Sequence, residues 1–169
     1  IVGILGPNGC GKTTTIGMIL GLLKPTKGRV LIDGFEIEKK RVYLLNNLNF
    51  ISPYIELPKK LTVKQNLEVY GRLYDIKNLN TKIDYLSEKL RLNEIIYKVT
   101  GELSSGQKNR VSLAKSIIND PTVLLLDEPT ASLDPETGDF IRSFLENYQK
   151  EKGASILLAS HNMAEVERL

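Results

Sequence analysis

The sequence predicts an α/β fold, in which helices flank a mainly parallel sheet and a small helical region is inserted into the chain. Three apolar runs, at 1–5, 123–126 and 155–159, each have the length of one strand. Continuous apolar runs are expected of parallel strands that are buried on both faces. Between these runs apolar residues recur at helical spacing, so strands and helices alternate, as they do around parallel sheets with right-handed crossovers.

The first apolar run opens directly into Gly6–Thr13, GPNGCGKT, which matches the phosphate-binding pattern G-x-x-x-x-G-K-T. Its glycines let the backbone approach an anion, at the positive end of a helix expected over Thr14–Leu23. Lys12 adds a positive charge near the β- and γ-phosphates, and the Thr13 hydroxyl suits Mg²⁺. The loop predicts a P-loop NTPase fold, with nucleotide-binding residues Gly6, Asn8, Gly9, Cys10, Gly11, Lys12, Thr13 and Thr14.

Composition limits the classes of protein that fit. The 169 residues are 41% apolar, enough for a core, and the net charge of +3 is too small to indicate nucleic acid, so none is expected as a partner. One cysteine excludes an internal disulfide and a zinc cluster, which fits a reducing, cytoplasmic setting. No apolar stretch has the length of a membrane span. The first residue already lies on a strand and Leu169 lies in a helical pattern, so we expect the middle of a larger domain.

The remaining pattern gives the expected order of elements. A strand over Arg29–Ile32 should end in the Asp33-Gly34 turn, and Phe50-Ile51 should form another short strand. Residues 54 to about 100 have helical character. Thr62–Gln65 is a capping-box pattern that opens a first helix. A second helix should follow it, and then a third, short one over Ile95–Val99. Another helix should end near 119. We predict an ATP-binding core formed by 1–52 and 121–169, interrupted by a helical subdomain at 53–120.

Polar residues follow the expected strands. Asp127 and Glu128 follow the run at 123–126, and His161 follows the run at 155–159. Because the carboxyl ends of strands face the ligand in open α/β sheets, these residues should meet the phosphate loop. The segment Leu103–Gln107, LSSGQ, opens a helix and so offers a second anion site.

Together these motifs resemble the nucleotide-binding domain of ABC ATPases, in the family's order from residue 6 to residue 161. The Lys12 loop is similar to Walker A, Leu124–Glu128 to Walker B with its catalytic glutamate, and Leu103–Gln107 to the signature, which usually reads LSGGQ. Ser132-Leu133-Asp134 resembles the D-loop, and His161 the switch histidine.

The resemblance implies Mg²⁺-dependent ATP hydrolysis with assigned roles. Asp127 and Thr13 would hold Mg²⁺, Glu128 would deprotonate the attacking water, and His161 and Lys12 would contact the γ-phosphate. A second ATP-binding domain is implied in a head-to-tail dimer, where the signature binds the ATP of the partner. Ser104 and Gly106 are assigned to that contact, and Ser105, Gln107 and Asp134 are further predicted nucleotide-binding residues.

Two residues depart from the family pattern. Ser105 stands where glycine is usual, a mild change, and Pro53 stands where the Q-loop glutamine is expected, so that contact is missing or is replaced by Ser52. The adenine-stacking aromatic of the family would lie before residue 1.

The expected function is the ATPase subunit of an ABC-type membrane transporter, with an exporter favoured. It would lie on the cytoplasmic face of the membrane against a transmembrane permease subunit, with Tyr54, Ile55, Leu57 and Pro58 as candidate contacts. One alternative is a non-transport ABC ATPase of translation or DNA repair, although no heptads lie between Lys12 and Ser104. Another is a P-loop GTPase, since Thr81–Asp84 matches the guanine-reading pattern T-K-x-D; no strand precedes it.

Overall fold

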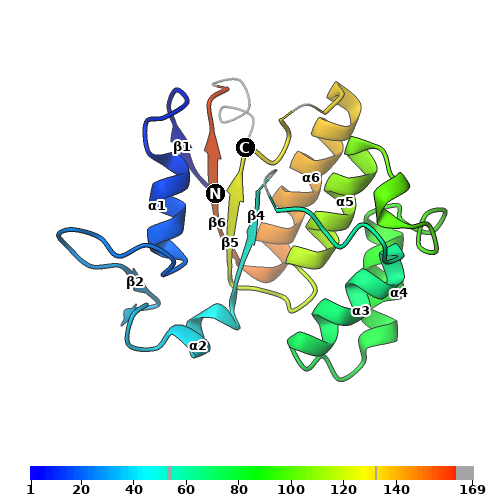
Figure 1. Ribbon diagram of the computed structural model, residues 1–169, viewed down its shortest axis with the longest axis horizontal. Coiled ribbons are helices and arrows are strands. Elements are labelled where there is room, and N and C mark those ends of the chain that lie inside the picture. Colours follow the sequence, from blue (N-terminus) through cyan, green and yellow to red (C-terminus); the bar gives the residue numbers. More distant parts are fainter. Residues whose placement is uncertain (53–54, 132, 163–169) are drawn as a thin grey trace.

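A computed structural model describes residues 1–52, 55–131 and 133–162. Its central sheet has four parallel strands in the order β1-β6-β5-β4. Figure 1 shows this sheet with α1 on one side and α5 and α6 on the other, while α3 and α4 lie beyond α5. The strands are β1 (Val2–Leu5), β4 (Leu48–Ile51), β5 (Val123–Asp127) and β6 (Ser155–Ser160).

Three strands of the sheet, β4, β5 and β6, contribute side chains to both of two cores. Leu124 and Leu126 of β5 join the core formed with α3, α5 and α6, which we call the α5-side core. Leu125, between them, joins the α1-side core around Ile16. This is the period-two alternation of a strand, and it makes β5 apolar on both faces. The prediction of buried parallel strands is therefore confirmed for β5 and β6, but it is wrong for β1, whose Val2 and Leu5 are 63% and 41% exposed at the edge of the sheet.

The helices predicted after the phosphate loop, after Thr62 and after Leu103 are present, but the first ends at Ile19 and not at Leu23. They are α1 (Lys12–Ile19), α2 (Arg41–Leu45), α3 (Val63–Leu73), α4 (Leu79–Lys89), α5 (Ser105–Ser116) and α6 (Pro135–Lys152), with a 3₁₀ turn η1 at Thr100–Glu102. The predicted capping box at Thr62 is present: its hydroxyl accepts from the Gln65 N–H, and the Gln65 side chain accepts from the Thr62 N–H. The strand predicted to end at Ile32 is shorter than expected, since β2 (Leu31–Ile32) pairs with β3 (Phe35–Glu36) across the Asp33-Gly34 turn.

The third short helix predicted at Ile95–Val99 is wrong. This segment consists of turns and a single antiparallel bridge from Val99 to Thr62. The carbonyls of Ile96 and Lys98 accept from the first N–H groups of α3, at Lys64 and Val63. Those bonds satisfy the carbonyls of this segment and the first N–H groups of α3. A helix of only five residues would form few hydrogen bonds of its own, too few to offset the unfavourable free energy of helix nucleation.

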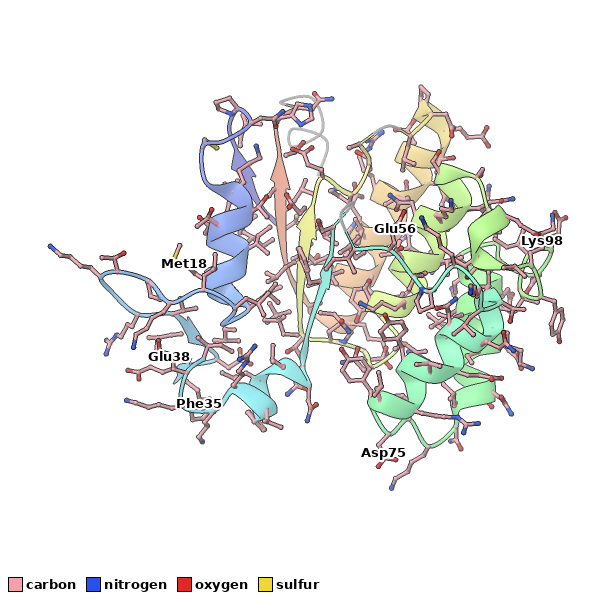
Figure 2. The ribbon with its side chains drawn as sticks, in the orientation of Figure 1. Met18, Phe35, Glu38, Glu56, Asp75 and Lys98 are labelled. Atoms are coloured by element: carbon pink, nitrogen blue, oxygen red, sulfur yellow. The ribbon has the colours of Figure 1, made fainter. Side chains whose placement is uncertain are left out.

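The two sides of the molecule have different architectures. Figure 2 shows Met18, Phe35 and Glu38 on the α1 side, and Glu56 and Lys98 on the side of the helical region.

The whole is a P-loop NTPase α/β fold. The division of the chain into a core and a helical subdomain at residues 52 and 120 stays a prediction. Among the residues that the structure describes, no helix combines the length and apolar character that crossing a membrane requires.

Candidate active site

The phosphate loop joins β1 to α1 at the upper edge of the sheet in Figure 1. Gly9 and Gly11 have φ values of 83° and 101°, which a side chain would disfavour. At the start of the loop, a Cβ on Gly6 would lie 2.5 Å from the Cys10 Sγ. The backbone path thus favours glycine at positions 9 and 11, and the Cys10 side chain fills the space beside Gly6, while Asn8, Gly9 and Cys10 are exposed along the loop.

Helix α1 begins directly at Lys12, with Gly11 as a cap that offers no side-chain acceptor. The first N–H groups of a helix have no partner within the helix, so these groups, with the exposed Thr13 and Thr14 among them, can bind an anion. Lys12 is 8% exposed, and its Nζ donates to the Gly6 and Pro7 carbonyls at 2.6 and 3.2 Å. The ammonium group therefore lies over the loop that would hold the phosphates.

Thr13 and Asp127 meet across the sheet edge. The Thr13 Oγ1 donates to the Asp127 Oδ2 at 2.9 Å, and Asp127 is 1% exposed. A hydroxyl and a carboxylate at this distance are oxygen donors of the kind that Mg²⁺ takes, together with water and substrate phosphates. The two residues predicted as metal ligands thus fit the ion.

Glu128 follows β5 and lies against the end of β6. Its Oε1 is 2.7 Å from the His161 Nδ1 and 3.9 Å from the Lys12 Nζ. Its Oε2 accepts from the Ser160 hydroxyl at 3.2 Å. The register that pairs Leu5 with Ser160 and Asp127 with Ala159 places these strand ends together. The structure therefore brings Lys12, Thr13, Asp127, Glu128 and His161 to one place, as the sequence predicts.

The segment Ser104–Gln107 lies across the sheet from the phosphate loop, at the start of α5 (Figure 1). Its residues form a second capping box, in which the Ser104 hydroxyl accepts from the Gln107 N–H at 3.3 Å. A Cβ on Gly106 would touch Thr137 of α6 at 3.4 Å, so the first turn of α5 packs against the start of α6. Ser104 and Ser105 are exposed and available to a partner.

Asp134 caps α6 at the same edge. Its Oδ1 accepts from the Thr137 N–H at 2.9 Å. That N–H, followed by the Thr137 side chain, lowers the pKa of the Asp134 carboxyl. Ser132, in the predicted D-loop, lies outside the described residues.

The Q-loop position also lies outside them, since Pro53 and Tyr54 are not described. The preceding Ser52 is 7% exposed and lines a cavity of about 280 Å³ together with Glu128 and Ser105. Of the candidate permease contacts, Ile55 is 50% exposed and lines the same cavity, whereas Leu57 is buried in the α5-side core. Leu57 lines this cavity as well, so its role as a contact stays a prediction.

Sequence reasoning missed two residues of this region. One is Ser160, which precedes His161; a serine at the end of an apolar strand carries no distinctive spacing. Asn109 lies within α5, where its Nδ2 donates to the Pro129 carbonyl at 2.6 Å. A polar residue on the sheet-facing side of α5 could have drawn attention to it, but its acceptor lies 20 residues away in the chain.

The guanine-reading alternative does not agree with the structure. Thr81–Asp84 lies within α4, and the Lys82 Nζ donates to Asp120 at 2.6 Å. Asp84 is exposed on the helix. A base-reading loop at the end of a strand is therefore not formed by these residues.

Comparisons with known proteins identify the family of the chain. The ABC transporter family model matches residues 1–131. The chain is 34% identical over 172 residues to the ABC transporter ATP-binding protein NatA of Bacillus subtilis, covering 100% of this chain and 70% of that protein. It is 39% identical over 170 residues to the Nod factor export ATP-binding protein I of Rhizobium johnstonii, covering 99% of this chain and 54% of that protein.

A solved structure is similar over nearly the whole chain. It is a dimeric, post-hydrolysis state of an ATP-binding cassette bound to ADP and Pi, and it matches with a TM-score of 0.88 and 26% identity. The match covers 99% of this chain and 77% of that one. The chain spans 70% of the NatA protein and about half, 54%, of the Nod factor protein.

Proposed function

Because the chain belongs to the ABC transporter family, whose ATP-binding domains are ATPases in general, we propose that it hydrolyses ATP to power a membrane transporter. The observation that carries this proposal is the Glu128 carboxylate, which contacts His161 at 2.7 Å and lies 3.9 Å from Lys12 of the phosphate loop. An acid in this position can orient and deprotonate a water beside a bound γ-phosphate.

The other residues of the site have separate roles in the reaction. The N–H groups of the phosphate loop and Lys12 bind and orient the phosphates, while Thr13 and Asp127 hold Mg²⁺, which neutralises phosphate charge when bound. His161 and Ser160 orient the two oxygens of Glu128. His161, with its side chain 52% exposed, remains accessible to the γ-phosphate.

A second copy or a related domain completes the site. Ser104, Ser105, Gly106 and Gln107 form an exposed helix start away from the phosphate loop of their own chain. In a head-to-tail dimer this helix start would bind the ATP held by the partner, with Asp134 beside it. The dimeric state of an ATP-binding cassette that resembles this chain supports a second copy as the partner.

The direction of transport and the partner are part of the proposal. The resemblance to a Nod factor export protein favours an exporter. The permease subunit would dock at the segment that contains Ile55 and Pro58, and the protein would lie on the cytoplasmic face of the membrane. Apolar Ile55, 50% exposed at the mouth of a cavity, is the side chain available for this contact. No observation favours the alternative role in translation or DNA repair.

Co-purification with the membrane protein encoded beside it tests the transporter role. The intact pair should copurify in detergent, hydrolyse ATP in preference to GTP, and lose association in Ile55→Asp. Leu73→Asp is the matched control, because Leu73 is an exposed apolar residue at the far end of α3. A polytopic partner that binds Ile55→Asp as well as the wild type would remove Ile55 from the interface. Hydrolysis of GTP in preference to ATP would refute the proposed function.

A further inference from the structure

Glu128 has a backbone conformation that needs support. Its φ is 51°, in the left-handed region, where a residue other than glycine is held at a cost of about 1 kcal/mol or more. The Glu128 N–H donates to the Ala159 carbonyl at 2.9 Å, and the Glu128 carbonyl accepts from the Ala131 N–H at 3.2 Å. These bonds fix the residue from the side of β6 and from the following turn.

Helix α5 supports the same turn from the opposite side. The Asn109 Nδ2 donates at 2.6 Å to the carbonyl of Pro129, the residue directly after Glu128. The Pro129 carbonyl is thereby fixed in direction, and with it the peptide plane that follows the left-handed residue. Asn109, Glu128 and Pro129 also line one cavity of about 280 Å³, so the bond lies beside space into which the turn could otherwise relax.

A second contact joins the same two parts of the chain. Gly106, one helical turn before Asn109, packs against Thr137, whose N–H is held by Asp134. The first turns of α5 therefore contact both ends of the segment 128–137. An approach or rotation of α5 would move the Glu128 turn with it.

We infer that Asn109 is a positioning residue for hydrolysis, which holds the Glu128 turn in its productive conformation through Pro129 and links it to the helix that starts with Ser104. This inference rests on the proposed function. If the start of α5 binds the ATP of a second copy, the Asn109–Pro129 bond connects that ATP site to the catalytic carboxylate of this one. Occupation of one site would then affect the rate in the other.

Substitution of Asn109 in the intact protein tests the inference. Asn109→Leu removes the donor while keeping the side-chain shape and neutrality. The expected kcat is about five- to ten-fold lower, the effect of one lost hydrogen bond, with the KM for ATP within about two-fold of wild type. Asn109→Gln keeps an amide donor and should retain kcat within about two-fold.

Asn119→Leu is the control in the turn that follows α5, where the Asn119 Oδ1 accepts from the Asn49 Nδ2 at 2.6 Å. The Asn119 Nδ2 also donates to a backbone carbonyl, that of Asn46, at 2.7 Å. This variant should lower the unfolding temperature without lowering kcat. In the nucleotide-free protein, amide hydrogen exchange at Ala131 should accelerate in Asn109→Leu and not in Asn119→Leu, because the Ala131 N–H belongs to the Glu128 turn.

The outcomes separate this inference from the proposed function. A wild-type protein without ATP hydrolysis contradicts the proposed function. An active wild type whose kcat and Ala131 exchange are unchanged in Asn109→Leu contradicts the positioning role alone. Equal losses of kcat in Asn109→Leu and Asn119→Leu would also contradict it, because they would show a general effect of destabilising α5.

Discussion

The two ends of β5 carry acidic residues with nearly the same backbone conformation and different surroundings. Asp120 comes before the strand with φ 49°, and Glu128 comes after it with φ 51°. The Asp120 carboxylate accepts from two ammonium groups, those of Lys82 at 2.6 Å and Lys152 at 3.0 Å. Glu128 contacts a hydroxyl and an imidazole, with Lys12 at 3.9 Å.

This difference separates a structural site from a site suited to chemistry. Aspartate tolerates the left-handed region better than glutamate, and two direct charge partners keep Asp120 ionised. Glutamate is less favoured than aspartate in the left-handed region, so the backbone of Glu128 is the more strained of the two. This strained residue lies beside the phosphate loop, and such strain is typical of functional sites. Its two closest partners, a hydroxyl and an imidazole, orient its two oxygens. We therefore assign catalysis to the carboxyl end of β5 and stability to the amino end.

The largest expected effect comes from Glu128→Gln. The amide keeps the shape of the side chain but cannot take a proton, so phosphate release should fall by about 10²- to 10⁴-fold. The free energy of unfolding should remain close to that of the wild type. Turnover at the wild-type rate would exclude Glu128 as the general base.

A smaller effect is expected from Ser160→Ala. The Glu128 Oε2 loses the hydroxyl that donates to it at 3.2 Å, while the His161 contact to Oε1 remains. We expect kcat to fall about three- to ten-fold, the range for one hydrogen bond to a charged group that is partly replaced by water. Steady-state kinetics with Ser155→Ala as control, at the exposed start of β6, would measure it. A Ser160→Ala protein with unchanged kcat would remove Ser160 from the positioning of Glu128.

The smallest effect belongs to the other end of β5. Burial of Asp120 opposes its ionisation, but hydrogen bonds from Lys82 and Lys152 outweigh it and hold its pKa below the usual value. A lowered folded-state pKa stabilises the protein above the unfolded-state pKa near 3.9, and the contribution is lost as the pH falls through the folded-state value. Asp120→Asn should therefore destabilise by about 0.5–1 kcal/mol at pH 7, since the pair is partly exposed.

The difference between this variant and the wild type should shrink as the pH falls through the folded-state pKa of Asp120, because protonation removes the charge from both ion pairs. Urea unfolding at pH 7 and near pH 2.5 would measure the difference. Asparagine is also accepted in the left-handed region, so the backbone should not contribute. A loss of kcat in Asp120→Asn would break the separation between the two ends of the strand.

Much of this arrangement could be predicted from the sequence, and the reasons are local. The Gly6–Thr13 loop and the run that ends at Asp127 are recognised by residue type and spacing. Together they predict which edge of the sheet carries the proposed ATP site. The Asn109–Pro129 bond and the Lys82–Asp120 pair join residues 20 and 38 positions apart, and no local pattern encodes them. The error at Ile95–Val99 has the same origin, because the carbonyls of that segment are satisfied by α3.

The most direct test of the account is the mass of the Glu128→Gln protein in solution by light scattering, with MgATP and with MgADP. If Glu128 removes the proton from the attacking water in a site completed by a second copy, the variant should bind ATP without hydrolysing it. We predict a stable dimer with MgATP and a monomer with MgADP or without nucleotide. A monomer in every condition, together with normal ATP binding, would contradict a site that is shared between two copies.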